Sequence, residues 1–213
     1  MKKLYVFGDS FSDENIISNN KSYIVWKGYT PKTFHQIISE KLGLEVVNFA
    51  KNYGMDNYTI FHQICDNINN MDDSIVIINW SEIMRFRMVD TSTGKWRTIL
   101  GPYSMRLKKG LPFVNGIPND TILTTIQNRK HKLWITEINS WIEIINKALK
   151  DNVVVHWGWS NVIYRETITE ETNGEVEDFH YSEKGHLDLA EWILEQINKG
   201  GYHKSPYLES SIL

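Results

Sequence analysis

The sequence contains a single cysteine, Cys65, among its 213 residues. One cysteine can form neither an internal disulfide nor a cysteine metal cluster, and its apolar helical surroundings indicate a buried thiol. No run of about 18 apolar residues occurs, so no membrane-spanning helix is expected. Long basic runs are also missing, and the formal net charge is −3. Neither nucleic acid nor an anionic membrane is therefore an expected partner.

Several further absences narrow the function. The first strand is not followed by Gly-x-Gly-x-x-Gly, and no Gly-Lys-Ser/Thr loop occurs, so nucleotide binding is poorly supported. Lys2 and Lys3 imitate the basic start of a signal peptide, but the apolar run after them stops at Gly8, too soon for its hydrophobic region. The sequence thus predicts a cytoplasmic protein without a signal peptide, unless a larger particle carries it out.

Apolar strand patterns and helical patterns alternate along the chain. The ranges 4–7, 44–49, 74–80 and 152–157 read as strands, and 57–68, 133–149 and the stretch from Ser182 onward read as helices. A further helix is predicted through Leu42, with Thr30 as N-cap and Pro31 in its first turn. This alternation predicts one α/β domain over residues 1–213 with a mainly parallel sheet, helices on both faces and ligands at the carboxyl ends of the strands.

Residues 88–130 interrupt this pattern. They are rich in glycine, proline and scattered aromatic residues, and they predict no regular structure. A loop this long in a compact domain usually serves as a lid or a binding surface, and an insertion without a functional role is the alternative.

Two segments at opposite ends of the chain carry candidate chemistry. Gly8-Asp9-Ser10 follows the first strand, and Glu177 and Asp178 precede His180 just before the last helix. A serine becomes a nucleophile when a histidine takes its proton, a carboxylate orients that histidine, and hydrogen-bond donors stabilise the oxyanion. Taken separately, the first segment could be a helix-capping turn and the second an acidic surface loop.

Together the segments resemble the SGNH hydrolase family, also called GDSL esterases and lipases. Gly8-Asp9-Ser10 is similar to its first block, and His180, with the Ser182 and Gly185-His186 that follow, is similar to its last. The order of the motifs agrees over nearly the whole chain. The resemblance implies a three-layer, flavodoxin-like α/β sandwich, Ser10 as nucleophile, His180 as base, and neither metal nor cofactor.

The two middle blocks agree less well. Gly54 matches the family's second block, whose backbone N–H serves the oxyanion. The third block is normally Gly-x-Asn-Asp, but here Asn79-Trp80-Ser81-Glu82 stands in its place. Ser81 occupies the asparagine position and is expected to donate its hydroxyl instead. The Trp-Ser-x-x-x-Arg pattern ending at Arg85 is similar to a variant of some phage-associated members, which makes a phage particle a possible location.

The acid remains open between two neighbours, because Glu177 has the family's spacing and Asp178 its residue type. His186 also follows a glutamate at that spacing, but it lies inside the last helix, where packing is the simpler interpretation. The side chains assigned to substrate binding follow the motifs or predicted strand ends: Asp9, Asn57, Trp80, Arg85 and Trp157. Aromatic rings at such positions suit sugars or acyl chains.

The sequence therefore predicts a serine esterase that works through an acyl-enzyme, with a small-molecule or glycan ester as substrate and acyl or acetyl groups on carbohydrate favoured. The alternative is a catalytically weak glycan-binding module with the same fold, since the third block lacks its asparagine. The particular ester and the oligomeric state do not follow from the sequence.

Overall fold

The computed structural model describes residues 2–50, 55–81, 85–90, 95–99, 131–158 and 165–207. Within these ranges the centre of the molecule is a sheet of β1 (Lys3–Phe7), β2 (Glu45–Asn48), β3 (Ile75–Trp80) and β6 (Val153–Gly158). The strands are all parallel and stand in the order β2-β1-β3-β6. The chain moves outward from β1 to β2 and then returns past β1 to β3. The order reverses between β1 and β3, and sheets of this kind bind ligands at such a point.

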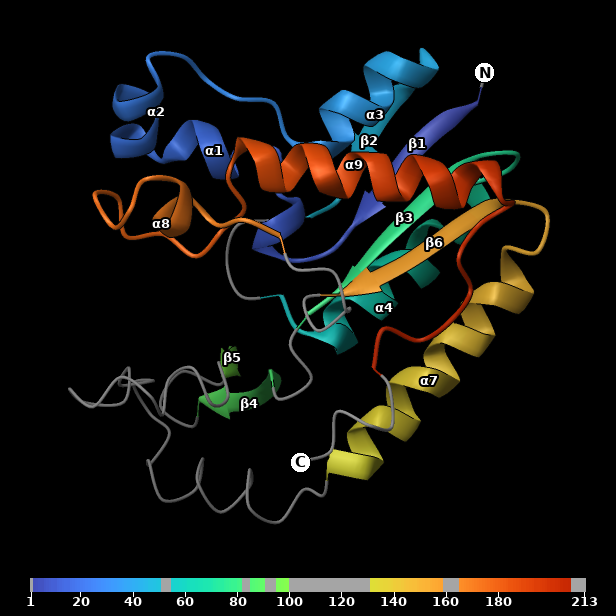
Figure 1. Ribbon diagram of the computed structural model, residues 1–213. Helices are drawn as coiled ribbons and strands as arrows, with labels where there is room; N and C mark the ends of the chain where they lie inside the picture. The colour runs from blue at the N-terminus through green and yellow to red at the C-terminus, as the bar shows by residue number, and fades with distance from the viewer. Residues whose placement is uncertain are drawn as a thin grey trace.

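Helices cover both faces of the sheet (Figure 1). One face carries α4 (Asn57–Asn67) and α7 (His131–Ala148), and the other carries α3 (Phe34–Leu42) and α9 (Glu183–Asn198). Alternate residues of a strand point to opposite faces, so Tyr5 and Phe7 enter one core while Leu4 and Val6 enter the other. Every residue of β3 is buried, as its continuous apolar run predicts. The predicted three-layer α/β architecture is confirmed.

The helix boundaries agree with the sequence except at the start of α3. The N-cap of this helix is Thr33, whose backbone N–H donates to Oε1 of Gln36 at 2.9 Å, so the predicted cap at Thr30 and first turn at Pro31 are wrong. A cap is chosen by which side chain reaches the free N–H groups, and a proline alone does not decide it. Gly43 ends α3 in the left-handed conformation, with φ of 63°.

Short elements that the sequence pattern does not predict gather past the carboxyl ends of the strands, at the left of Figure 1. They are α1 (Ile16–Asn19), α2 (Lys21–Lys27) and α8 (Ile168–Glu171), joined by a small core of their own. Two 3-10 helices, η1 (Ser10–Ser12) and η2 (Ile68–Asn70), follow β1 and α4.

The antiparallel hairpin of β4 (Phe86–Asp90) and β5 (Lys95–Ile99) overlaps the start of the region for which no regular structure was predicted. That part of the prediction is corrected, and residues 100–130 lie outside the described residues.

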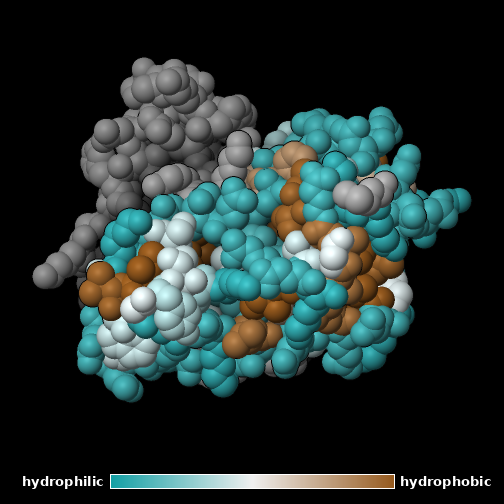
Figure 2. Space-filling model, turned by 90° about the horizontal axis from the view of Figure 1, so that it is seen from above, coloured by the Kyte–Doolittle hydropathy of each residue, from teal (hydrophilic) through white to brown (hydrophobic). Residues whose placement is uncertain are grey.

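The surface seen in Figure 2 is mostly polar, with apolar patches between the polar side chains. The large apolar side chains that are exposed include Val25 and Trp26 on α2 and Leu187 on α9. In the part of the chain that the structure describes, no helix combines the length and the apolar character needed to cross a membrane.

Candidate active site

The turn after β1 brings Ser10 to the end of the sheet. A Cβ atom on Gly8 would lie 2.6 Å from the Cβ of Asn79 and 3.0 Å from the Oγ of Ser12. Only glycine fits there, so the end of β1 can lie directly against the end of β3. Asp9 then caps η1 by accepting the N–H of Phe11 at 3.1 Å, and Ser10 is the first residue of that turn.

Ser10, His180 and Asp178 form a continuous hydrogen-bonded relay. Nε2 of His180 lies 3.0 Å from Oγ of Ser10, and Nδ1 lies 2.6 Å from Oδ1 of Asp178. An ionised carboxylate can only accept, so Nδ1 carries the imidazole proton and Nε2 offers its lone pair to the serine hydroxyl. This is the tautomer that a serine nucleophile requires of its base.

Of the two candidate acids, the structure places Asp178 against His180. The same Oδ1 atom also accepts the backbone N–H of His180 at 2.9 Å, whereas Glu177 is exposed. Burial alone would raise the pKa of Asp178, but hydrogen bonds from His180 and Asn20 and the charge of His180 hold this pKa below its ordinary value. An ionised Asp178 can stabilise the imidazolium that forms when His180 takes a proton.

The backbone around Asp178 is fixed by α8. The N–H of Asp178 donates to Oγ1 of Thr169 at 2.8 Å, and the carbonyl of Asp178 accepts the N–H of Thr169 at 3.0 Å. Phe11 packs on the imidazole of His180 with ring centroids 4.9 Å apart. The side chain of His180 keeps 27% of its surface exposed, so a substrate can reach the relay.

His186 occupies a packing position, as its place in the last helix suggests. It is buried, and Nδ1 accepts the N–H of Phe34 at 3.3 Å. Burial, together with the nearby His35 and His180, lowers the pKa of His186 to about 3. A histidine this hard to protonate and shielded from solvent cannot replace His180 as the base.

Asp9 is the centre of a second cluster, next to Ser10. Its carboxylate accepts from the Nδ2 of Asn79 at 2.7 Å, the Oγ of Ser81 at 2.9 Å and an Nη1 of Arg85 at 3.1 Å, besides the N–H of Phe11. Only 4% of the Asp9 side chain is exposed. Asp9 thus joins the loops after β1 and β3, and it has no oxygen free for a substrate.

This cluster changes the interpretation of Ser81. A hydroxyl has one proton, and Ser81 gives its proton to Asp9. Asn57 holds the backbone of Ser81 from the other side, because its Oδ1 accepts the Ser81 N–H at 2.7 Å and its Nδ2 donates to the Ser81 carbonyl at 3.2 Å. Asn57 is buried in this contact, away from the surface where a substrate would bind.

The predicted aromatic residues lie in the core. Trp80 and Trp157 are fully buried, in the cores on opposite faces of the sheet, and Nε1 of Trp80 donates to Nδ1 of His156 at 3.0 Å. Their expected role as a substrate platform is therefore wrong, because both faces of the sheet are covered by helices and each ring points into one of the two cores. Arg85 keeps 14% of its side chain exposed beside Asp9. Gly54 lies outside the described residues.

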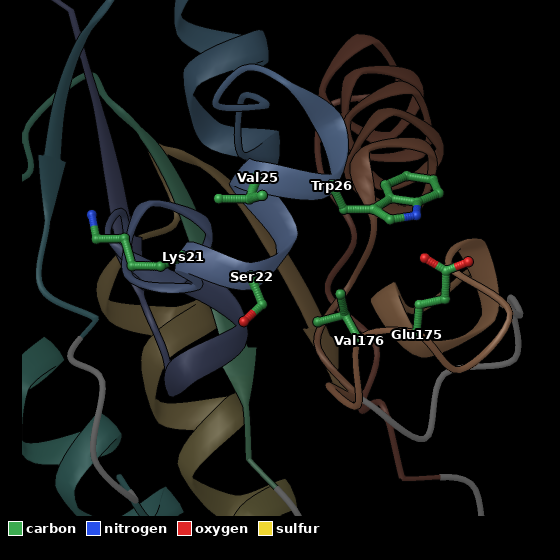
Figure 3. A pocket seen from close by; sticks show the side chains of 6 residues that line it. All are labelled: Lys21, Ser22, Val25, Trp26, Glu175 and Val176. Atoms are coloured by element: carbon green, nitrogen blue, oxygen red, sulfur yellow. The ribbon is translucent and has the colours of Figure 1, made fainter.

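A shallow groove of about 440 Å³ lies between α2 and the segment that precedes Asp178 in the chain (Figure 3). It is lined by α2 and by the segment before Asp178, through Lys21, Ser22, Val25, Trp26, Glu175 and Val176. Trp26 is 41% exposed there. Nothing in the sequence pattern pointed to this groove, since it forms between segments about 150 residues apart. Within the described ranges, no three histidine, cysteine or acidic side chains converge as metal ligands would.

No protein-family model matches the chain, and no curated protein matches it. Among solved structures it is similar to an acetyl xylan esterase from the rumen bacterium Butyrivibrio proteoclasticus, with a TM-score of 0.45 and 9% sequence identity. The match covers 92% of this chain and 64% of that chain, so the chain spans less than two thirds of the esterase's length. A likeness this weak does not bear on function, for which the geometry of the site is the basis.

Proposed function

We propose that the chain is a serine ester hydrolase of the SGNH type. The observation that carries this proposal is the relay from Asp178 through His180 to Ser10, with contacts of 2.6 and 3.0 Å. Its members come from opposite ends of the chain and meet where the strand order reverses. Binding a glycan does not require a carboxylate, an imidazole and a serine hydroxyl to be hydrogen-bonded in sequence. The relay therefore favours an enzyme over a glycan-binding module.

The reaction follows from the proton positions. Nε2 of His180 takes the proton of Ser10 as Oγ attacks the ester carbonyl carbon. The resulting imidazolium is stabilised by Asp178 and then protonates the leaving alkoxide, which frees the alcohol and leaves an acyl-enzyme. Water then gives a proton to the same nitrogen as it attacks the acyl carbonyl carbon. The imidazolium returns that proton to Oγ as the acyl–Oγ bond breaks, which releases the carboxylic acid and restores Ser10.

The oxyanion donors in this proposal are the backbone N–H groups of Ser10 and Gly54. Ser81, first considered a donor, acts through Asp9 by holding the Ser10 turn. Removal of a true oxyanion donor costs about 10²- to 10³-fold in kcat. Ser81→Ala is expected to cost about tenfold or less, because Asp9 keeps three other donors.

For the substrate we favour acyl or acetyl esters on carbohydrate. The support is the groove between α2 and the segment that precedes Asp178, where an exposed indole (Trp26) lies with the hydroxyl of Ser22 and the carboxylate of Glu175. An aromatic face with hydrogen-bonding groups around it suits a sugar ring. Trp26→Ala should then raise KM for an acetylated oligosaccharide and leave KM for p-nitrophenyl acetate unchanged.

The decisive test compares Ser10→Ala with Ser12→Ala. Ser12 is the matched control, because it is buried two residues away and its Oγ has no hydrogen-bond partner among the described residues. Ser10→Ala should lower hydrolysis of p-nitrophenyl acetate on the order of 10⁴-fold and abolish labelling by a fluorophosphonate probe, while Ser12→Ala keeps both. Unchanged turnover in Ser10→Ala, or no labelling of the wild-type chain, would refute the proposal.

A further inference from the structure

The carboxylate of Asp178 is held from two directions. Oδ1 binds the ring and the backbone of His180, both of which are local contacts. Oδ2 accepts from Nδ2 of Asn20 at 2.6 Å, across 158 residues of sequence. Among the described residues, Asn20 supplies the contact from a distant part of the chain that keeps this carboxylate from rotating.

The fold also fixes which end of the Asn20 amide faces Asp178. Asn20 is the N-cap of α2, and its Oδ1 accepts the N–H of Tyr23 at 2.9 Å. The opposite amide orientation would place two acceptors together at Asp178 and two donors together at Tyr23. The cap of a short helix therefore delivers a donor to the acid of the relay.

The helix that carries Asn20 is itself fastened. Lys27 lies 2.6 Å from Glu171 of α8 and 2.8 Å from Glu183 at the start of α9. Tyr23 donates to Glu171 and accepts the backbone N–H of Glu183 at 2.9 Å. These partly buried contacts tie α2 to the two elements that flank the segment 172–182, so Asn20 approaches Asp178 from a rigid support.

We propose that Asn20 is a positioning residue of this site and that the relay has four members, Ser10, His180, Asp178 and Asn20. By binding Oδ2, Asn20 stops the carboxylate from turning and keeps Oδ1 aligned with Nδ1 of His180. The inference rests on the proposed hydrolase function for its kinetic consequences. Its structural part, the alignment of Asp178, does not need catalysis.

The test separates positioning from helix capping. Serine is about as good an N-cap as asparagine, but it is too short to reach Asp178. Asn20→Ser should therefore keep the KM of the wild type and lower the thermal midpoint by no more than about 4 °C, the cost of one lost hydrogen bond, while kcat falls about tenfold. Asn20→Asp also keeps a capping oxygen but sets a second carboxylate against Asp178, and kcat should fall about 10²-fold. Asn19→Ser, at the exposed neighbouring position, should change neither.

A second measurement is independent of turnover. The Nδ1 proton shared by His180 and Asp178 should give a low-field proton resonance, assigned by its loss in Asp178→Ala. This resonance should persist in Asn19→Ser and move or broaden in Asn20→Ser.

Wild-type kcat in Asn20→Ser overturns the inference, and so does a kcat loss that comes with a fall in the thermal midpoint well above about 4 °C, since a loosened fold would then explain the loss. If the wild-type chain hydrolyses no ester, the proposed function fails. The resonance alone then decides on Asn20, and an unchanged signal in Asn20→Ser rejects its role.

Discussion

Asp9→Asn tests whether the carboxylate beside Ser10 is a structural centre. The replacement keeps the shape of the side chain and removes its charge. One amide oxygen can still serve two of the present donors, but the amide nitrogen is itself a donor and must face the other two. If it faces Ser81 and Arg85, the hydroxyl can rotate and accept, whereas the guanidinium loses its only acidic partner among the described residues.

The expected cost follows from that loss. Removing one partner of a buried ion pair costs about 3–5 kcal/mol. Arg85 keeps 14% of its side chain exposed and also donates to the carbonyl of Met55 at 3.3 Å, so the lower end applies. About 3 kcal/mol in a chain of this size lowers the thermal midpoint by roughly 6–12 °C.

Thermal unfolding followed by circular dichroism measures this change, and Asp13→Asn is the control. Asp13 is also buried, but within the part of the chain that the structure describes its carboxylate accepts only the N–H of Asn15, at 2.8 Å, which an amide oxygen can still accept. Its cost should stay below about 1 kcal/mol. Fluorophosphonate labelling of Ser10 should slow in Asp9→Asn and not in Asp13→Asn. Equal thermal midpoints for the two variants would show that the charge of Asp9 does not hold these loops together.

Three further predictions concern the acid, the turn and the buried histidines. Asp178→Asn should lower kcat about 10³- to 10⁴-fold on p-nitrophenyl acetate, because a neutral amide no longer selects the tautomer or stabilises the imidazolium, while Glu177→Gln stays active; comparable losses would reject the assignment of the acid. Gly8→Ala should cost about 3 kcal/mol in thermal unfolding, since its Cβ would lie 2.6 Å from the Cβ of Asn79, against about 1 kcal/mol for Gly28→Ala, where a Cβ meets open space; equal costs would contradict the steric reason. Burial is the main cause that lowers the pKa of three histidines to about 4, 3 and 3, namely His35, His156 and His186. As the pH falls below about 6.5, the unfolded chain takes up protons that the folded chain does not, so stability should fall by about 1.4 kcal/mol per pH unit for each histidine until the folded pKa is reached. Urea unfolding midpoints between pH 7 and pH 4.5 measure this slope; His156→Gln should remove about a third of it, and a flat profile would contradict the buried neutral state.

The sheet was predictable because burial on both faces leaves a strong signal. Strands such as β3 must be apolar along nearly their whole length, and the helical segments between the strands are the crossovers that a parallel order requires. The helix α2 gave no such signal, because Trp26 and Val25 remain exposed and its stability comes from contacts with α8 and α9. The sequence signal for the start of α2 is its N-cap, Asn20, and asparagine is just as common in loops.

At the site, the sequence predicted which motifs come together better than it predicted the contacts of single side chains. The order of the motifs predicted that Ser10 and His180 belong to one site, and the structure brings them within 3.0 Å, although His180 lies between α8 and α9 and not at the end of a sheet strand. Spacing and residue type favoured different acids, Glu177 and Asp178. The spacing rule failed because a turn brings the carboxylate of Asp178, only two residues before His180, back to the imidazole. Trp80 and Trp157 were misplaced because a strand end can be as deeply buried as its centre when helices cover it.

The two aspartates near Ser10, Asp9 and Asp178, differ in which groups donate hydrogen bonds to their carboxylate oxygens. The carboxylate of Asp9 accepts hydrogen bonds from the turn after β1, from the end of β3 and from residues that follow β3. These donors lie close to it because β1 and β3 are neighbours in the sheet. Asp178 lies outside the sheet, on a segment held by α8, and there one oxygen stays with Asn20 and the other meets the imidazole. An aspartate saturated by the fold can only hold a loop, whereas one with an oxygen directed at a histidine can stabilise a developing charge. In the proposed function the same residue type therefore takes a structural role at one end of the chain and a catalytic one at the other, and what distinguishes the two carboxylates is the contact of one of them with an imidazole.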